Sequence, residues 1–186
     1  GASCDHVPIP ACPDLRVGVG ALVLVFGPPS AGKSTLTLQW LASIEGPVAM
    51  LAAEEGLGPT LGARLQRLGI KRRDLHILGR GSVDALGQLL TSTKARALLV
   101  DSITVTTFTP YDLRALLNVT PIKALLGVVQ VAKDGTMAGS NRLAHDADVM
   151  VEVLDGQWRL TKSRYQPMGL SGEVPGVTSD EAGRSP

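Results

Sequence analysis

One stretch limits what this chain can fold into more than any other: GPPSAGKS, at residues 27–34. It follows an apolar run at 20–26 and leads into residues 33–44, whose apolar side chains recur at helical spacing. The pattern G-x-x-x-x-G-K-[ST] between a strand and a helix is that of a phosphate-binding loop, in which backbone amides and a helix N-terminus surround phosphate oxygens. The stretch therefore predicts a nucleotide-binding α/β domain.

Apolar runs alternate with helical patterns along the rest of the chain. Strands are predicted at 47–53, 75–78, 96–102 and 125–131, and helices at 59–70, 82–93 and 110–117. The stretch 147–165 is predicted to form two antiparallel strands joined at Asp155–Gly156, a strong hairpin signal. The sequence thus predicts an α/β fold with a mostly parallel sheet, flanked by helices, and a C-terminal antiparallel hairpin.

Length and composition fit one such domain. The 186 residues contain 44% hydrophobic but only 3% aromatic residues, so the core must rest on Val, Leu, Ile and Ala, as in buried parallel sheets. Residues 1–15, with three prolines, are predicted as an irregular lead-in, 16–168 as the core and 169–186, rich in Gly, Ser and Pro, as a flexible tail.

Charge and cysteine content narrow the class of partner. A net charge of +1 does not by itself mark a nucleic-acid-binding chain. Cys4 and Cys12 lack the second pair that a four-cysteine zinc site requires. No apolar run approaches the roughly 18 residues of a membrane span, and no signal-like start is visible, so we expect a cytoplasmic protein with no membrane partner.

The glycine-containing loop assigns a role to each of its side chains. Gly27 and Gly32 allow a tight backbone path, Lys33 would neutralise the β- and γ-phosphates, Ser34 would ligate Mg²⁺ and Thr35 would lie near the α-phosphate. The residues expected to surround the nucleotide are Gly27, Pro28, Pro29, Ser30, Ala31, Gly32, Lys33, Ser34 and Thr35.

Polar residues follow three of the other predicted strands. Asp101 ends the run ALLV and is the best second Mg²⁺ ligand, because parallel strands present ligand sites at their carboxyl edge. Glu54 follows VAMLAA and is the candidate for activating water, with Glu55 second; the alternative is a solvated acidic turn. Gln130, near the end of LLGVVQV, would sense the γ-phosphate, or would simply cap its strand.

A basic cluster and an acidic loop base remain. The cluster could contact a phosphate backbone or a partner, although the solvated face of an amphipathic helix is the favoured interpretation. Its members are Arg64, Arg67, Lys71, Arg72, Arg73 and Arg80. His145 and Asp148 are predicted to position the base of a loop rather than to bind metal.

Several segments together resemble one superfamily. The acidic pair, LLVDS (98–102), VVQVAKDGTMAGSNRLAHDADVMVEV (128–153) and RLTKSRY (159–165) are similar to segments of the RecA-superfamily ATPases, above all of RadA-type proteins. The resemblance covers about residues 18–168, and the combination is far more specific than the phosphate loop alone. It implies a RecA-like core with ATP and Mg²⁺ as cofactors.

The resemblance also implies roles for particular residues. Glu54 would activate water, Gln130 would occupy the nucleotide-sensing position and 132–141 would form the DNA-facing loop. Lys162 and Arg164 match a K-x-R motif that, in this family, touches nucleotide or DNA across a subunit boundary. Residues two apart on a strand face the same way, roughly 6.6 Å apart, so both cations could meet one anion; the alternative is an exposed basic strand.

The chain also departs from the family pattern. Ser163 replaces the Asn of the K-x-R motif, and Gln166 replaces its Gly. The segment between Asp101 and the Gln130 strand is short, which indicates a reduced first DNA loop. The resemblance does not extend to the family's zinc-binding and protease-like domains, so we expect a stripped ATPase core.

Three functions are compatible with these observations. The first is an ATP-driven, DNA-stimulated protein that acts in recombination, repair or replication. It would assemble head to tail into a ring or filament on DNA, above all on single-stranded DNA. Another protein of those processes would be a further partner. The second is a regulatory ATPase that controls a partner protein. The third, a small-molecule kinase, explains the loop and Asp101 but leaves Glu54 and Gln130 without roles.

Overall fold

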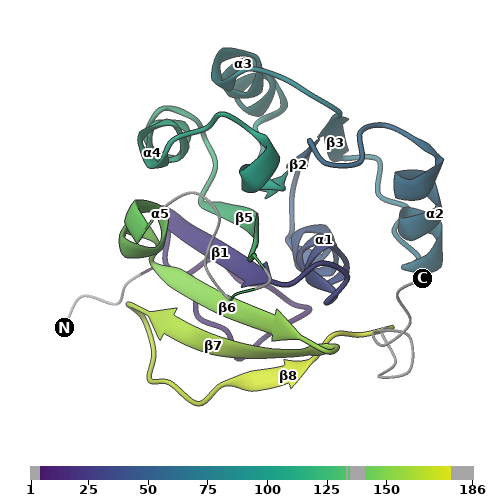
Figure 1. Ribbon diagram of the computed structural model, residues 1–186. Helices are drawn as coiled ribbons and strands as arrows, with labels where there is room; N and C mark the ends of the chain where they lie inside the picture. Colours follow the sequence, from purple (N-terminus) through teal and green to yellow (C-terminus); the bar gives the residue numbers. More distant parts are fainter. Residues whose placement is uncertain (1–4, 133, 135–140, 177–186) are drawn as a thin grey trace.

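The computed structural model describes residues 5–132, 134 and 141–176, and these form one eight-stranded sheet (Figure 1). The strands are β1 (Ala21–Gly27), β2 (Val48–Ala52), β3 (Leu75–Leu78), β4 (Ala97–Asp101), β5 (Ala124–Gln130), β6 (Val149–Leu154), β7 (Gln157–Ser163) and β8 (Ser171–Glu173). They lie in the order β3-β2-β4-β5-β1-β6-β7-β8, and every pair from β3 to β6 is parallel whereas β7 and β8 are antiparallel. The predicted α/β class and terminal hairpin are confirmed.

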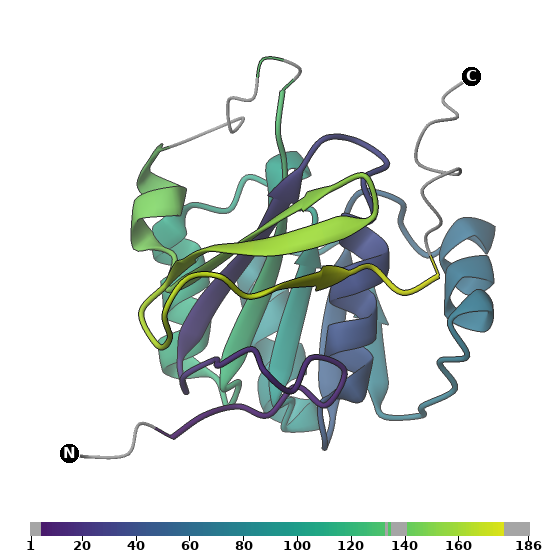
Figure 2. The ribbon, with the colours of Figure 1, turned by 90° about the horizontal axis from the view of Figure 1, so that it is seen from below.

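Helices cover both faces of the sheet (Figures 1 and 2). They are α1 (Lys33–Ser43), α2 (Pro59–Arg67), α3 (Val83–Thr93), α4 (Pro110–Val119) and α5 (Asn141–Asp146), with a 3₁₀ turn at Ile103–Val105. Apolar residues of α1 and α2 pack into one core cluster, and those of α3, α4 and α5 pack into a second on the opposite face. On the α1 face, Trp40 meets Trp158 of β7 edge to face, with the ring centroids 5.7 Å apart.

The central strands are apolar on both sides. Leu22, Val23 and Leu24 of β1 are fully buried, and β1 pairs with β5 on one side and with β6 on the other. A strand buried on both faces carries a continuous apolar run rather than an alternating one. This is why the runs of Val, Leu and Ala in the sequence predicted these strands to within one or two residues.

Polar side chains cap two of the helices. The Ser82 hydroxyl accepts a hydrogen bond from the Ala85 amide, 3.1 Å away, at the start of α3. Thr109 and Asp112 form a capping box at the start of α4. In the β6–β7 turn, Asp155 and Gly156 both have positive φ, 50° and 74°, as a two-residue hairpin of this type requires.

Two segments outside the predicted core contribute to it. In the lead-in, Val7, Ile9 and Leu15 are buried in the α1-side cluster. The range predicted as a flexible tail contains β8 and the buried Val174, so the structure corrects that prediction for residues 169–176. Residues 177–186 and Cys4 lie outside the described part of the chain. Neither segment has the periodicity that would have indicated burial. The lead-in has no regular repeat, and β8 is a short strand that pairs with β7.

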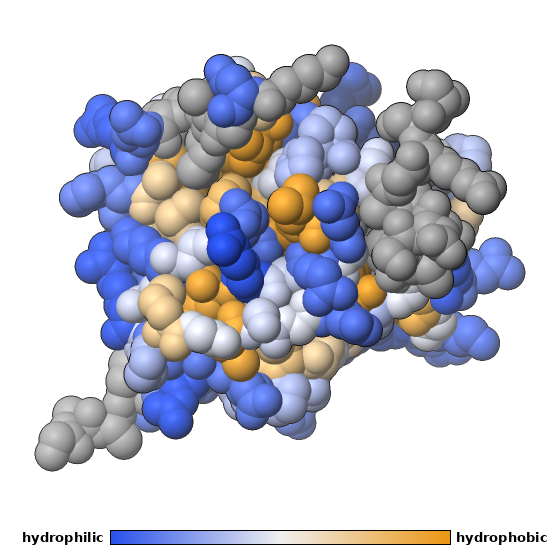
Figure 3. Space-filling view, turned by 60° about the horizontal axis from the view of Figure 1, so that its bottom comes forward, coloured by the Kyte–Doolittle hydropathy of each residue, from blue (hydrophilic) through white to orange (hydrophobic). Residues whose placement is uncertain are grey.

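The side of the molecule that carries β7 and β8 has a mixed surface. Figure 3 shows hydrophobic areas there separated by hydrophilic side chains. Over the whole described surface, the large exposed apolar residues include Val19, Leu154 and Met168.

Among the described residues, no helix has the length and apolar character needed to cross a membrane.

Within the basic cluster, Arg72 has a structural role. Its guanidinium donates to the carbonyl oxygens of Ala42 (2.9 Å), Ile44 (2.5 Å) and Gly46, and it pairs with Asp74 at 2.7 Å. These carbonyls belong to the last turn of α1 and the loop after it, where helix geometry leaves acceptors unpaired. Arg72 therefore fastens α1 to the start of β3.

Because of this role, substitutions of the adjacent residues Arg72 and Arg73 should affect stability differently. We expect Arg72→Ala to lower the free energy of unfolding by about 2 kcal/mol, because hydrogen bonds from a charged donor to buried carbonyls are lost. Arg73→Ala, at the exposed neighbouring position, is the matched control, with a change within about 0.5 kcal/mol. Urea denaturation measures both; equal effects would contradict the assignment.

Candidate functional site

Four strand ends meet at one edge of the sheet. The loop 27–34 follows β1, Glu54 follows β2, Asp101 ends β4 and Gln130 ends β5. Backbone bonds hold these ends in register: the Glu54 amide donates to the Asp101 carbonyl (3.1 Å) and the Val131 amide to that of Gly27 (3.2 Å). The parallel topology thus brings together the candidate nucleotide and catalytic residues that the sequence places up to about 100 positions apart.

Two glycines are required in the loop for different reasons. Gly32 has a φ of 107°, a conformation that residues with a side chain rarely adopt. Gly27 has ordinary backbone angles, but a Cβ there would lie 2.1 Å from the carbonyl oxygen of Val153 on β6. Gly32 therefore shapes the loop, and Gly27 lets β6 pack beside β1.

Lys33 is buried inside the loop that it closes. Its side chain is almost fully shielded, and its ammonium donates to the Pro28 carbonyl at 2.5 Å. Burial lowers the pKa of Lys33, and the nearby carboxylates of Glu54 and Asp101 oppose this effect. A cation held this way is already positioned for phosphate oxygens.

Ser34 and Asp101 fit a magnesium site. Their side chains line one small cavity, and Asp101 is 4% exposed. Burial raises the pKa of Asp101, while the Ser34 hydroxyl and the charge of Arg64 oppose the rise. Among the described residues, Asp101 Oδ1 has no hydrogen-bond partner, and no group of three or more His, Cys, Asp or Glu could hold a metal. A hydroxyl and one carboxylate suit Mg²⁺, which takes its other ligands from water and phosphate.

The acidic pair splits into two environments. Glu54 lines the phosphate pocket and accepts a hydrogen bond from the Gln130 side chain. Glu55 instead pairs with Arg64, with 2.5 Å between its Oε1 and Arg64 Nη1. Glu54 is thus the carboxylate that faces the space above the loop.

The pocket itself measures about 430 Å³. It is lined by Pro29, Ser30, Ala31, Gly32, Lys33, Ser34, Thr35, Glu54, Arg64, Arg67, Val128, Gln130 and Gly176. Arg64, Arg67 and Gly176 line the pocket but were not predicted as site residues. The spacing of Arg64 and Arg67 did offer a signal, since residues three apart on a helix share a face. Gly176 had no such signal.

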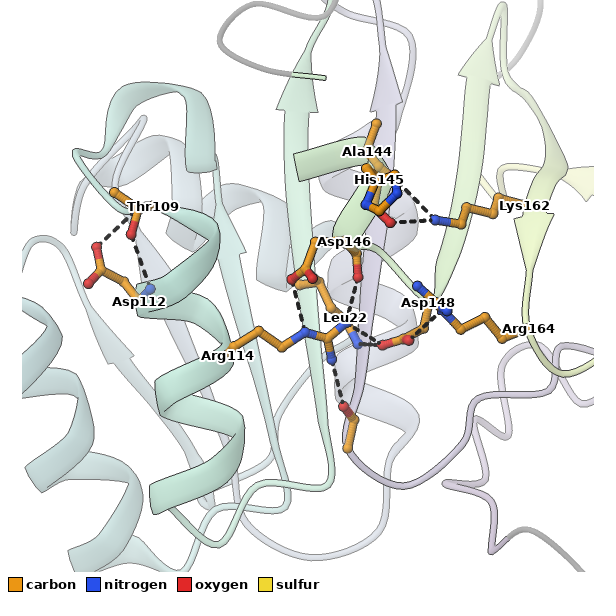
Figure 4. A network of polar contacts seen from close by, with 11 residues as sticks. Leu22, Thr109, Asp112, Arg114, Ala144, His145, Asp146, Asp148, Lys162 and Arg164 are labelled. Carbon is orange, nitrogen blue, oxygen red and sulfur yellow. Dashed lines mark hydrogen bonds and ion pairs between the residues drawn. The ribbon is translucent and has the colours of Figure 1, made fainter. Parts of the chain in front are cut away.

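Lys162 and Arg164 lie away from this pocket. Lys162 pairs with Met150 near the start of β6, which runs parallel to β1, so both cations lie toward the opposite edge of the sheet. Lys162 donates to the carbonyls of Ala144 (3.1 Å) and His145 (2.9 Å) at the end of α5 (Figure 4). The structure therefore does not bring the K-x-R pair to its own chain's phosphate loop.

Asp148 is the centre of the charge network at that edge (Figure 4). It accepts from the Leu22 amide (2.8 Å) and pairs with Arg114 (3.0 Å) and Arg164 (2.9 Å). Arg114, from α4, also pairs with Asp146 of α5 at 2.9 Å. The network joins α4, α5, β1 and the end of β7. Arg114 had no sequence signal, and the expected role of Asp148 at the base of the loop stays a prediction.

A second groove lies between α4 and α5. It measures about 590 Å³ and is lined by Pro110, Tyr111, Arg114, Asn141, Arg142, His145 and Asp146. Tyr111 is 80% exposed there. The groove adjoins the predicted DNA-facing loop 132–141, most of which lies outside the described residues.

The sequence has relatives among DNA repair proteins. It is 29% identical over 174 residues to the DNA repair protein RadA of Haemophilus influenzae, covering 83% of this chain and 38% of that protein. With RadA of Bacillus subtilis it shares 30% identity over 149 residues, 71% of this chain and 32% of that protein. The chain thus spans less than two fifths of the length of these relatives. No family model matches it.

A solved ATPase domain shares its fold. The two chains superpose with a TM-score of 0.65 at 15% identity, covering 81% of this chain and 80% of that one. Together with the RadA similarity, this confirms the RecA-like core expected from the sequence.

Proposed function

We propose that this chain, a RecA-superfamily P-loop ATPase by its sequence relatives and fold, binds ATP with Mg²⁺ and couples hydrolysis to work on DNA in the cytoplasm. One observation carries the proposal: Lys33, Ser34, Asp101, Glu54 and Gln130 converge at one sheet edge beside a pocket formed by the phosphate loop.

Each converging group has a chemical task in phosphoryl transfer. Lys33 and the loop amides would hold the phosphates, and Ser34 and Asp101 would hold Mg²⁺, which would neutralise charge on the β- and γ-phosphates. Glu54 orients and deprotonates the attacking water. Gln130 contacts Glu54 directly, so a γ-phosphate that displaces the Gln130 amide also changes the position of the base.

The groove between α4 and α5 supports DNA as the partner. It combines an exposed aromatic ring, Tyr111, with Arg142 and His145, and bases stack on aromatic rings while cations meet the backbone. Such a surface accepts single strands without reading their sequence. The RadA relatives are named for DNA repair, which agrees with this choice.

The position of the K-x-R pair supports assembly. Lys162 and Arg164 lie toward the sheet edge opposite the phosphate loop, so they serve a nucleotide only if it is bound by a neighbouring copy. Head-to-tail association into a ring or filament places one chain's Arg164 near the next chain's pocket. A cation supplied in this way accelerates phosphoryl transfer by about 10³–10⁵.

A turnover measurement tests the proposal as a whole. We expect Mg²⁺-dependent ATP hydrolysis that rises when single-stranded DNA is added, because the groove and the site belong to one fold. Lys33→Ala removes the cation inside the loop and should abolish turnover while leaving the unfolding temperature nearly unchanged.

The other functions give different results in the same assay. A regulatory ATPase would hydrolyse ATP at a rate that DNA does not change, and a kinase would need a small-molecule acceptor. Tyr111→Ala should lose most of the DNA stimulation and keep the basal rate. Equal hydrolysis by the wild type and Lys33→Ala would remove the site assignment.

The two adjacent glutamates should differ in their effect on catalysis. We expect Glu54→Gln to keep Mg²⁺-ATP binding and to slow hydrolysis about 10²-fold or more, since the base loses its charge but keeps its shape. Glu55→Gln should slow it much less, because Glu55 faces Arg64. Single-turnover rates measure both; the reverse order would mean that Glu55 is the base.

Complementation tests the shared site. We expect turnover per chain to rise with protein concentration and Arg164→Ala to be nearly inactive alone. Mixing Arg164→Ala with Lys33→Ala should restore activity, because some interfaces then pair an intact loop with an intact Arg164. Specific activity that is independent of concentration, with no rescue in the mixture, would exclude this arrangement.

A further inference from the structure

We propose that Arg64 binds the terminal phosphate of a nucleoside triphosphate held by the same chain, and so gives the site its preference for triphosphate over diphosphate. The inference rests on the proposed function, because it concerns the same pocket. Arg64 would act in cis, from α2, in addition to Lys33 of the phosphate loop.

The position of Arg64 provides the first argument. Its side chain lines the phosphate pocket with residues 29–35 and also lines a smaller cavity of about 120 Å³ with Ser34, Glu54, Glu55 and Asp101. The side chain is 21% exposed, and its charge opposes the rise that burial causes in the pKa of Asp101. Arg64 thus lies beside the groups assigned to Mg²⁺.

That neighbourhood identifies which end of the nucleotide Arg64 meets. Mg²⁺ held by Ser34 and Asp101 would neutralise charge at the β- and γ-phosphates, and the water positioned by Glu54 would lie next to the γ-phosphate. A cation adjoining both Ser34 and Glu54 therefore lies at the terminal phosphate, away from the nucleoside. Arg67, one turn further along α2, lines the larger pocket but not the small cavity.

The guanidinium also has unused bonding capacity. It carries five N–H donors, and among the described residues its Nε is buried without a hydrogen-bond partner. The contact with Glu55 uses Nη1. Guanidinium groups favour phosphate through paired, charge-assisted hydrogen bonds, so the free donors of Arg64 match a terminal phosphate.

The ion pair between Arg64 and Glu55 balances charge in the site. Glu54, Glu55 and Asp101 place three carboxylates around a site that must accept a polyanion, and Lys33 alone does not offset them. Arg64 neutralises Glu55 before the nucleotide arrives. It can then bridge Glu55 and the terminal phosphate, which keeps that carboxylate from repelling the γ-phosphate.

Equilibrium binding of ATPγS and ADP with Mg²⁺, measured by calorimetry, tests the inference. We expect Arg64→Ala to weaken ATPγS binding by about 10-fold or more, the loss of hydrogen bonds to a charged group, and ADP binding by less than about twofold. Arg67→Ala is the matched control and should change both affinities by the same factor. Arg64→Lys should restore only part of the preference, because an ammonium lacks the paired donors.

The outcomes separate the two proposals. Equal losses for both nucleotides in Arg64→Ala, with wild-type binding intact, would overturn the role of Arg64 and leave the ATP site standing. Wild-type protein that binds neither nucleotide would overturn both proposals. If Arg64→Ala does not fold, Glu55→Gln decides: it leaves Arg64 in place and should keep or raise the triphosphate preference, and its loss would contradict the inference.

Discussion

Parallel pairing of β1 with β5, and of β4 with β5 and β2, is the constraint on which the rest of this structure depends. Parallel strands end at the same edge, so four separate chain segments deliver their polar ends to one place. The strands are apolar on both sides because helices cover both faces. The same burial that stabilises the sheet therefore leaves its carboxyl edge as the place where Lys33, Glu54, Asp101 and Gln130 gather.

The cost of charging each side chain at this edge depends on how deeply that side chain is buried. Asp101 is buried at a strand end, which makes its negative charge costly until a cation is near. Burial makes the positive charge of Lys33 costly in the same way, until an anion is near. Glu54 and Glu55 are adjacent in sequence but meet different partners, Gln130 and Arg64. A site with this arrangement is suited to a ligand that brings both a metal ion and several negative charges.

The opposite edge has its own charged centre, and the two are joined through β1. Asp148 bonds to the Leu22 amide at the start of β1, whereas the phosphate loop follows the end of that strand. Through Arg114 and Arg164, Asp148 also links the groove of α4 and α5 to the K-x-R pair (Figure 4). β1 thus has charged groups near both ends, the Asp148 network at its start and Lys33 of the phosphate loop after its end.

The sequence by itself determined strands β1 to β7, helices α1 to α4 and the phosphate loop, because these depend on local patterns: apolar runs, helical spacing and glycine spacing. It also identified the polar residues that end the strands, from the rule that parallel strands share an edge. Only the tertiary structure decided which of two adjacent glutamates faces the pocket, that Arg64 and Arg67 line it and Arg72 does not, and that β8 completes the sheet. The spacing of Arg64 and Arg67 places them on one face of α2, but the direction in which that face points, and the pairing of β8 with β7, depend on contacts between distant parts of the chain.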